Sequence, residues 1–277
     1  MKKMMKFEGR VSLSDYFIEK MIGSGGYSRV YRARWAKPFE NSPYGDVVAI
    51  KILNDWRIQE RNSIIKEFER EAKIAMKFDN KNIVKVHDFK VYDLEDRVYA
   101  MFMEYVDGKN LKEVLASDEI FSINEILRIF YEAGKGLEYI HGYGIVHKDV
   151  KPENILISND RKIVKITDFG LAKLPKRWWQ RDLSSHGGTD QYVAPEQRIG
   201  KSDIRSDIYS FGISLNEAIA KKLDSEERIH FYRHKLKSDG MTIPAKLKDL
   251  LIKATENDPD RRYQNMNEVL NDLSDFL

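Results

Sequence analysis

The chain has 277 residues, of which 42% are hydrophobic and 33% are charged, and this composition is typical of a folded globular protein rather than a disordered one. The formal net charge of +3 is the small difference between 47 basic and 44 acidic residues, so it indicates neither a nucleic acid nor an anionic membrane as a partner. Cysteine is absent, which excludes disulfides, thiolate metal sites and cysteine nucleophiles, and we expect a reducing, cytoplasmic compartment.

The first hundred residues show strand patterns and one helical segment. Between 58 and 78 the apolar residues recur every three or four positions, which predicts a helix with Ile64, Phe68 and Ala72 on its buried face. Strands are predicted at 16–22, 28–35, 46–53, 83–91 and 97–103. The longest apolar run, 98–103, is too short to cross a bilayer, so no membrane segment is expected in this chain. This order predicts a small antiparallel sheet with one helix.

The remainder of the chain is mainly helical in pattern, after a linker turn predicted at Asp107 and Gly108. Helices are predicted at 110–116, 123–141 and 204–221, with two or three shorter ones before the C-terminus. The helix at 123–141 is expected to be buried, because its apolar residues line one face. We therefore predict an α+β fold and a single domain with two lobes, 1–106 and 107–277, and a ligand cleft between them.

Two segments of the first lobe have the chemistry to hold an anion. Gly23, Ser24 and Gly25 lie between two predicted strands, where glycine lets a backbone approach phosphate oxygens, although alone this segment is more simply explained as a hairpin turn. Lys51 ends an apolar strand and must reach either solvent or a negative partner. Glu71 is on the apolar face of its helix, where an unpaired carboxylate would be costly, so we expect it to meet a cation.

A polar loop in the second lobe carries three candidate functional residues. Asp149, Lys151 and Asn154 lie between two apolar runs, 144–146 and 155–157, which predicts a short loop held rigidly by strands. Each residue taken singly could equally belong to a polar surface turn. Asp168 follows another strand-like run beside a glycine and is well placed to reach a cation.

In this order along the chain, the segments resemble the motifs of a eukaryotic-type Ser/Thr protein kinase domain. The matching stretches are Gly23-Ser-Gly25-Gly26, Val48-Ala-Ile-Lys51, Glu71, His147-Lys-Asp149-Val-Lys151-Pro-Glu-Asn154, Asp168-Phe-Gly170 and Ala194-Pro-Glu196. The resemblance implies a bilobal fold and an enzyme that transfers the γ-phosphoryl group of ATP, with Mg²⁺, to Ser or Thr hydroxyls of proteins. Two residues depart from the family pattern: Ser28 stands where a third glycine is usual, and Lys148 stands where arginine is usual.

The resemblance implies a role for each matching residue. Lys51 would contact the α- and β-phosphates and Glu71 would hold it in place, with Glu67 as the alternative partner. Asp149 would accept the proton of the attacking hydroxyl, and Lys151 would stand beside the transferred phosphoryl group. The resemblance further assigns Gly23, Ser24 and Gly25 to the phosphate loop, and Asn154 and Asp168 to the metal site, where their oxygen atoms suit Mg²⁺ or Mn²⁺. The adenine site would be made by Val30, Ala49, Met103, Glu104, Val106 and Leu156. Of these, Val30, Ala49 and Leu156 could otherwise be ordinary core residues.

Two further acids are expected to have structural roles. By the same resemblance, Asp207 would brace the backbone of the catalytic loop, and the alternative is an exposed acid in the first turn of its helix. Glu196 would pair with a buried arginine, for which Arg262 is the match and Arg261 the competitor.

Residues 171–188 are polar and basic, and they resemble an activation segment. Ser185 stands four residues before Thr189, the usual spacing of the regulatory phosphosite, with Ser184 as its neighbour, so we expect autophosphorylation here. In the family, the arginine before the catalytic Asp is one of the cations that bind the phosphorylated residue. Lys148 stands at that position and lacks the bidentate fork of arginine, so the alternative is a loop that is not modified. A pseudokinase scaffold and a small-molecule kinase are the rival functions. The four groups Lys51, Asp149, Asn154 and Asp168 argue against the first rival, and the Ala194-Pro-Glu196 stretch argues against the second.

Overall fold

The structure, a computed structural model, describes residues 12–13, 15–25, 28–37, 40–53, 61–93, 97–117, 119, 121–168, 190–222 and 244–277. The chain divides into two compact units. The first unit consists of Met1–Asp79 and Val84–Val106, and the second consists of Asn80–Ile83 and Asp107–Leu277. Within the described residues, no helix combines the length and the apolar character that a membrane span requires.

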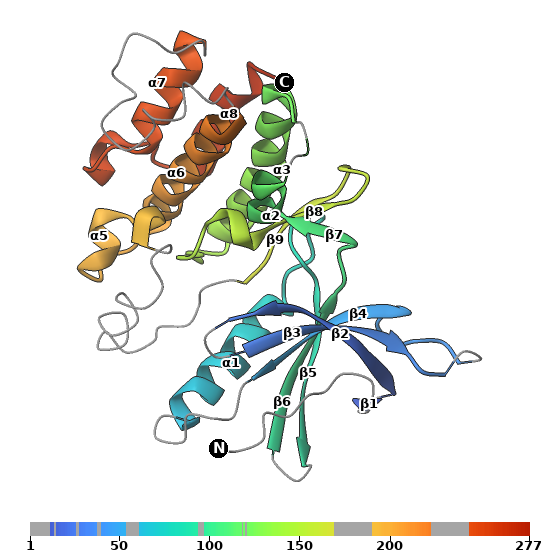
Figure 1. The fold of residues 1–277 in the computed structure, drawn as a ribbon. Helices are drawn as coiled ribbons and strands as arrows, with labels where there is room; N and C mark the ends of the chain where they lie inside the picture. Colours follow the sequence, from blue (N-terminus) through green and yellow to red (C-terminus); the bar gives the residue numbers. More distant parts are fainter. Residues whose placement is uncertain are drawn as a thin grey trace. The chain divides into compact units, whose positions relative to one another are not determined.

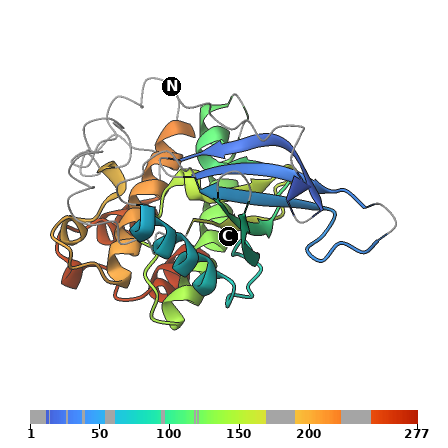
Figure 2. The same cartoon turned by 90° about the horizontal axis from the view of Figure 1, so that it is seen from below.

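The first unit is an antiparallel sheet with one helix. Its elements are β1 (Ser12–Leu13), β2 (Tyr16–Ser24), β3 (Ser28–Trp35), β4 (Val47–Leu53), α1 (Arg61–Ala75), β5 (Val86–Asp93) and β6 (Arg97–Glu104). The strands pair in the order β1-β2-β3-β4-β6-β5. Helix α1 lies on one side of this sheet in both views (Figures 1 and 2) and packs against β5, where Phe68 and Phe89 meet edge to face at 5.8 Å between ring centroids.

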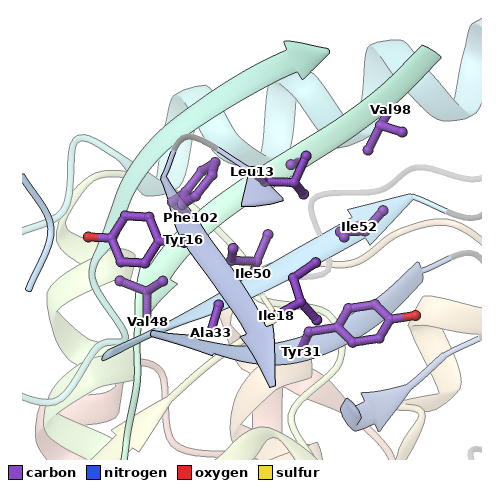
Figure 3. Packing of buried hydrophobic residues seen from close by; sticks show 11 residues of the cluster. Leu13, Tyr16, Ile18, Tyr31, Ala33, Val48, Ile50, Ile52, Val98 and Phe102 are labelled. Carbon is purple, nitrogen blue, oxygen red and sulfur yellow. The ribbon is translucent and has the colours of Figure 1, made fainter. Parts of the chain in front are cut away.

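The core of this unit gathers aliphatic and aromatic side chains from five strands (Figure 3). On β4, Val48, Ile50 and Ile52 belong to this cluster. They alternate with Ala49 and Lys51, which lie on the opposite face because successive side chains of a strand point to opposite sides. The strand therefore supplies a packed core with one face and presents Lys51 with the other.

The second unit is mainly helical. Its elements are β7 (Gly108–Asn110), α2 (Leu111–Ala116), α3 (Ile123–Gly142), η2 (Pro152–Asn154), β8 (Ile155–Ser158), β9 (Val164–Ile166), η3 (Asp190–Tyr192), α5 (Pro195–Arg198), α6 (Ile204–Lys222), α7 (Ala245–Ala254), η5 (Pro259–Arg261) and α8 (Met266–Ser274). Helix α3 begins with a capping box, in which the side chains of Ser122 and Glu125 each accept a hydrogen bond from the other residue's backbone N–H. Helices α3 and α6 lie side by side (Figure 1), with Phe130 edge to face against Phe211.

Residues 80–83 belong to the second unit because they dock onto α3 and β9. The Asn82 side chain donates to the Val164 carbonyl at 3.1 Å, and Ile83 forms a β-bridge with Ile166. Gly136 on α3 makes this approach possible, since a Cβ there would lie 2.7 Å from the Asn82 carbonyl oxygen.

Two local predictions were wrong. Gly108 is not part of a linker turn but begins strand β7, and a Cβ there would lie 1.9 Å from the Ile157 carbonyl oxygen, so glycine serves close strand pairing. The run 144–146 is not a strand. Gly144, with φ of 68°, closes α3 in a Schellman motif: its N–H donates to the His141 carbonyl, and the N–H of Ile145 donates to the Ile140 carbonyl.

Candidate active site

A buried ion pair lies in the first unit. Strand β4 carries Lys51 between Val30 on β3 and Met101 on β6, and α1 carries Glu71. The Lys51 Nζ is 2.9 Å from the Glu71 Oε1, and the two residues are only 8% and 9% exposed. The cation that the sequence required for Glu71 is thus Lys51. The structure pairs Lys51 with Glu71 and not with the alternative, Glu67.

The predicted phosphate loop is partly described. Gly23 and Ser24 end β2, and the N–H of Gly25 donates to the Ser28 carbonyl at 2.8 Å. A Cβ on Gly23 would make an ordinary 3.6 Å contact with Val30, so packing within this unit does not require glycine there. Packing therefore does not explain this glycine, and the phosphate-binding role of Gly23, Ser24 and Gly25 stays a prediction.

The residues predicted to surround adenine come from both units. In the first unit, Ala49 and Met103 are cross-strand partners, and Val106 ends the unit. The N–H of Glu104 already donates to the Lys85 carbonyl at 2.8 Å, so this N–H is not available to a ligand. In the second unit, Leu156 lies on β8, in register with Asn110 of β7 and Lys165 of β9.

A buried carboxylate fixes the backbone of the polar loop in the second unit. Asp207, near the start of α6, is 0% exposed. Its Oδ2 accepts from the N–H of His147 at 2.7 Å, and its Oδ1 accepts from the N–H of Lys148 at 2.8 Å. His141 contacts the same carboxylate at 2.8 Å. The alternative of an exposed first-turn acid is therefore wrong, because α6 packs Asp207 beneath the loop.

Three of the predicted site residues meet in this loop. The Asp149 Oδ2 lies 2.8 Å from the Lys151 Nζ and accepts from the Asn154 Nδ2 at 3.0 Å. Asn154 also donates to the Asp149 backbone carbonyl at 2.7 Å and is buried. The Asp149 side chain keeps 31% of its surface exposed. A carboxylate is thus held in a fixed position by an amine and an amide, and it is still reachable from solvent.

Asp168 is placed next to this loop. The N–H of Thr167, the preceding residue, donates to the Asn154 carbonyl at 3.0 Å. Asp168 itself has φ of 55°, a left-handed conformation that costs a non-glycine residue about 1–2 kcal/mol. Backbone strain of this kind is often found at functional sites.

The donor atoms suit Mg²⁺ delivered with a nucleotide. The Nδ2 of Asn154 faces Asp149, which leaves its Oδ1 for a metal, and Asp168 would supply a carboxylate. Over the described part of the chain, no group of three or more Asp, Glu, His or Cys residues could hold a metal ion. Mg²⁺ is usually bound by one or two carboxylates together with phosphates and water, so this donor set fits.

His147 is held as a neutral imidazole. A backbone N–H can only donate, so the Asp149 N–H, 3.3 Å from the His147 Nδ1, requires an unprotonated Nδ1. A carbonyl can only accept, so the Thr167 oxygen, 3.2 Å from the Nε2, requires a proton there. Burial lowers the pKa of His147, although Asp207 and Asp149 oppose this shift. The imidazole thus connects the loop to the strand end that precedes Asp168.

We expect His147 to make the protein less stable in mild acid. Above pH about 6.5 the imidazole is neutral in both states, and below it the unfolded chain binds a proton that the folded chain excludes. The free energy of unfolding should then fall by up to about 1.4 kcal/mol per pH unit from this group. Urea titrations at several pH values between 7.5 and 5 would measure the free energy of unfolding of the unmodified chain and of His147→Gln. When this free energy is plotted against pH, His147→Gln should show a smaller slope. Equal slopes in the two proteins would contradict it, since His87, whose pKa is also lowered by burial, is present in both.

A second buried ion pair anchors α5. The Arg262 Nη1 and Nη2 donate to the two carboxylate oxygens of Glu196 at 2.7 and 2.9 Å, and Ser206 donates to the same carboxylate at 2.6 Å. Burial alone would raise the pKa of Glu196, but the bonds from Arg262 and Ser206 lower it overall. Arg261 is exposed and lies 3.9 Å from Asp258. The structure therefore decides the choice between the two arginines in favour of Arg262.

Several sequence predictions lie outside the described residues, and some contacts were not predicted. Ser184, Ser185 and Thr189 fall in 169–189, as do the Phe and Gly that follow Asp168. Two contacts were not predicted: His141 contacts Asp207, and Gln197 donates to the Lys148 carbonyl. His141 could have been suspected because it ends the apolar face of α3, whereas no local pattern marks Gln197.

The comparisons with known proteins agree with this geometry. The family model described as "Protein kinase domain" matches residues 16–273. The chain belongs to the protein kinase family. The kinase domain is 34% identical, over 96% of its length, to a probable serine/threonine-protein kinase of Clostridium perfringens, and 33% identical, over 93%, to the serine/threonine-protein kinase PrkC of Bacillus subtilis. It spans 38% and 40% of those two proteins.

The fold of the kinase domain is also found among solved structures. A double mutant of the PknI kinase domain from Mycobacterium tuberculosis superposes with a TM-score of 0.70 at 23% identity, covering 98% of this chain and 99% of that one. The predicted α+β kinase fold is thereby confirmed. The departures at Ser28 and Lys148 are compatible with it.

Proposed function

We propose that this kinase domain transfers the γ-phosphoryl group of ATP to Ser or Thr hydroxyls of protein substrates. The observation that carries the proposal is the Asp149 carboxylate, which Lys151 and Asn154 hold in place while leaving it reachable. A carboxylate so placed suits a base for an incoming hydroxyl. The hydroxyl oxygen would bond to the γ-phosphorus, its proton would pass to Asp149, and the bond from the γ-phosphorus to ADP would break.

The other predicted residues would bind the nucleotide and its metal. Lys51, kept in position by Glu71, would neutralise the α- and β-phosphates, and Lys151 would neutralise the group in transfer. Asn154 and Asp168 would hold Mg²⁺, which would supply positive charge against the negative charge that develops on the phosphates. The enzyme would act mainly by positioning and charge neutralisation.

Two features favour this function over its rivals. A scaffold without activity would not need Lys51, Asp149, Asn154 and Asp168 together, yet all four are present. A small-molecule kinase would not need the Ala194-Pro-Glu196 stretch, which here starts α5 and is anchored by Arg262. We also propose that the domain acts in the cytoplasm and phosphorylates itself at Ser184 or Ser185.

Incubation with Mg-ATP, followed by mapping of phosphorylated residues by mass spectrometry, tests the proposal. The unmodified chain should label itself, with Ser184 or Ser185 among the sites, and it should label an added protein substrate. Asp168→Ala should abolish both, because one metal ligand is lost. Equal labelling by the two proteins would remove Asp168 from the mechanism. A thermal shift on adding Mg-ATP, without transfer to any protein, would favour the scaffold.

A further inference from the structure

The peptide group between Lys148 and Asp149 is held at both ends. Its N–H, from Asp149, donates to the His147 Nδ1 at 3.3 Å, and its carbonyl, from Lys148, accepts from the Gln197 Nε2 at 2.7 Å. A peptide group is planar, so fixing the N–H and the carbonyl fixes the rotation of the whole plane. The Asp149 side chain leaves the Cα at one end of that plane. Lys151 and Asn154 hold the carboxylate itself, and the two hydrogen bonds of the peptide group set the direction in which the side chain leaves the backbone.

The backbone of Lys148 has a conformation that depends on support from its surroundings. Its φ is 68°, in the left-handed region that costs a residue with a side chain about 1–2 kcal/mol. Such a conformation persists where the surroundings determine it. The angle φ describes rotation about the N–Cα bond of Lys148. Asp207 accepts from the N–H on one side of this bond, and Gln197 donates to the carbonyl on the other side. The two side chains together define the turn that leads into Asp149.

Gln197 is itself attached to a rigid support. It lies in α5, next to Glu196, whose carboxylate is bound by Arg262 and Ser206. The Lys148 carbonyl can only accept, so the amide must present its Nε2. Adjacent residues of α5 thus bind two places far apart in the chain: Glu196 binds Arg262, and Gln197 binds the loop that carries Asp149.

We propose that Gln197 is a positioning residue for phosphoryl transfer, which orients the Asp149 carboxylate by holding the Lys148 carbonyl. The proposal rests on the proposed kinase function. Gln197 does not contact the reacting groups in this scheme. It acts through the peptide group between Lys148 and Asp149. Because Gln197 directly follows the Ala194-Pro-Glu196 stretch in α5, its hydrogen bond connects the end of that stretch to the loop that carries Asp149.

Gln197→Met isolates this hydrogen bond, since methionine has a similar size but no donor. It also removes the Gln197 Oε1, which is buried without a hydrogen-bond partner among the described residues, and this offsets part of the cost of taking the donor from the Lys148 carbonyl. We expect kcat with a protein substrate to fall about 10- to 100-fold, with the KM for ATP nearly unchanged, because misplacing a reacting group lowers the rate of the chemical step. The matched control is Gln264→Met, which removes a 2.8 Å bond to the Arg262 carbonyl at an exposed position and should keep the kcat of the unmodified chain.

Gln197→Glu gives a readout that a packing defect would not produce. An ionised carboxylate cannot donate to the Lys148 carbonyl, whereas a protonated carboxyl can. The Lys148 carbonyl favours the protonated carboxyl, which raises its pKa above the ordinary value of about 4.3. The kcat of this variant relative to the unmodified chain should therefore rise as the pH is lowered from 8 towards 5. The same ratio for Gln197→Met should stay flat.

Amide hydrogen exchange separates failure of this inference from failure of the kinase function. Exchange at the Asp149 N–H should be faster by about threefold or more in Gln197→Met, whether or not the chain transfers phosphate. No transfer by the unmodified chain would refute the proposed function, and the exchange result would still decide the role of Gln197. A folded Gln197→Met protein with unchanged kcat and unchanged exchange would overturn the inference. If that variant does not fold, a flat pH ratio for Gln197→Glu would overturn it.

Discussion

Replacing Asp149 with asparagine should lower kcat for protein phosphorylation by about 10²- to 10⁴-fold, the usual contribution of a positioned base. Asparagine keeps the size of the side chain and an oxygen that accepts from Asn154 and Lys151, so the loop should keep its shape. It cannot take up the hydroxyl proton. Steady-state kinetics with a protein substrate would measure the loss, and we expect the KM for ATP to change little.

Asp275→Asn is the matched control for this experiment. It removes the same charge from an exposed residue of the second unit, whose carboxylate lies 3.3 Å from the Lys246 Nζ. We expect its kcat to equal that of the unmodified chain. If Asp149→Asn keeps more than about a tenth of the activity, Asp149 does not act as the base.

Replacing Arg262 with alanine should lower the free energy of unfolding by about 3–5 kcal/mol, the typical cost of leaving one partner of a buried ion pair alone. The Glu196 carboxylate would lose both Nη donors, and the Glu256 and Asn257 carbonyls would lose their partner as well. Chemical denaturation would measure the change. The effect should be smaller when Glu196→Gln is already present, because no buried charge is then left unpaired.

The neighbouring residue provides the control for this prediction. Arg261→Ala removes the same charge from an exposed side chain whose carboxylate neighbour is 3.9 Å away, and it should change stability by less than about 0.5 kcal/mol. Similar losses for the two alanine variants would show that the Glu196 pair is not the source of the stability.

Much of the fold follows from periodicity and local signals. The strand at 28–35 was predicted with its observed limits, and the helices at 123–142 and 204–222 within one residue. These elements have long, regular apolar patterns, and Ser122 with Glu125 adds a capping box. Gly108 and the run 144–146 were predicted incorrectly because a glycine can serve a turn, a helix end or a close strand contact, and sequence does not distinguish them.

By itself, the sequence determined which chemical groups this kinase domain carries and which of them share one loop. Asp149, Lys151 and Asn154 are close because they are at most five residues apart. The tertiary structure decided which distant residues support them: Asp207 lies 60 residues from His147, Gln197 lies 49 from Lys148, and Arg262 lies 66 from Glu196. The physical reason is that a hydrogen bond across such a separation forms only when packing of α5 and α6 brings both groups together, and no local pattern encodes that approach.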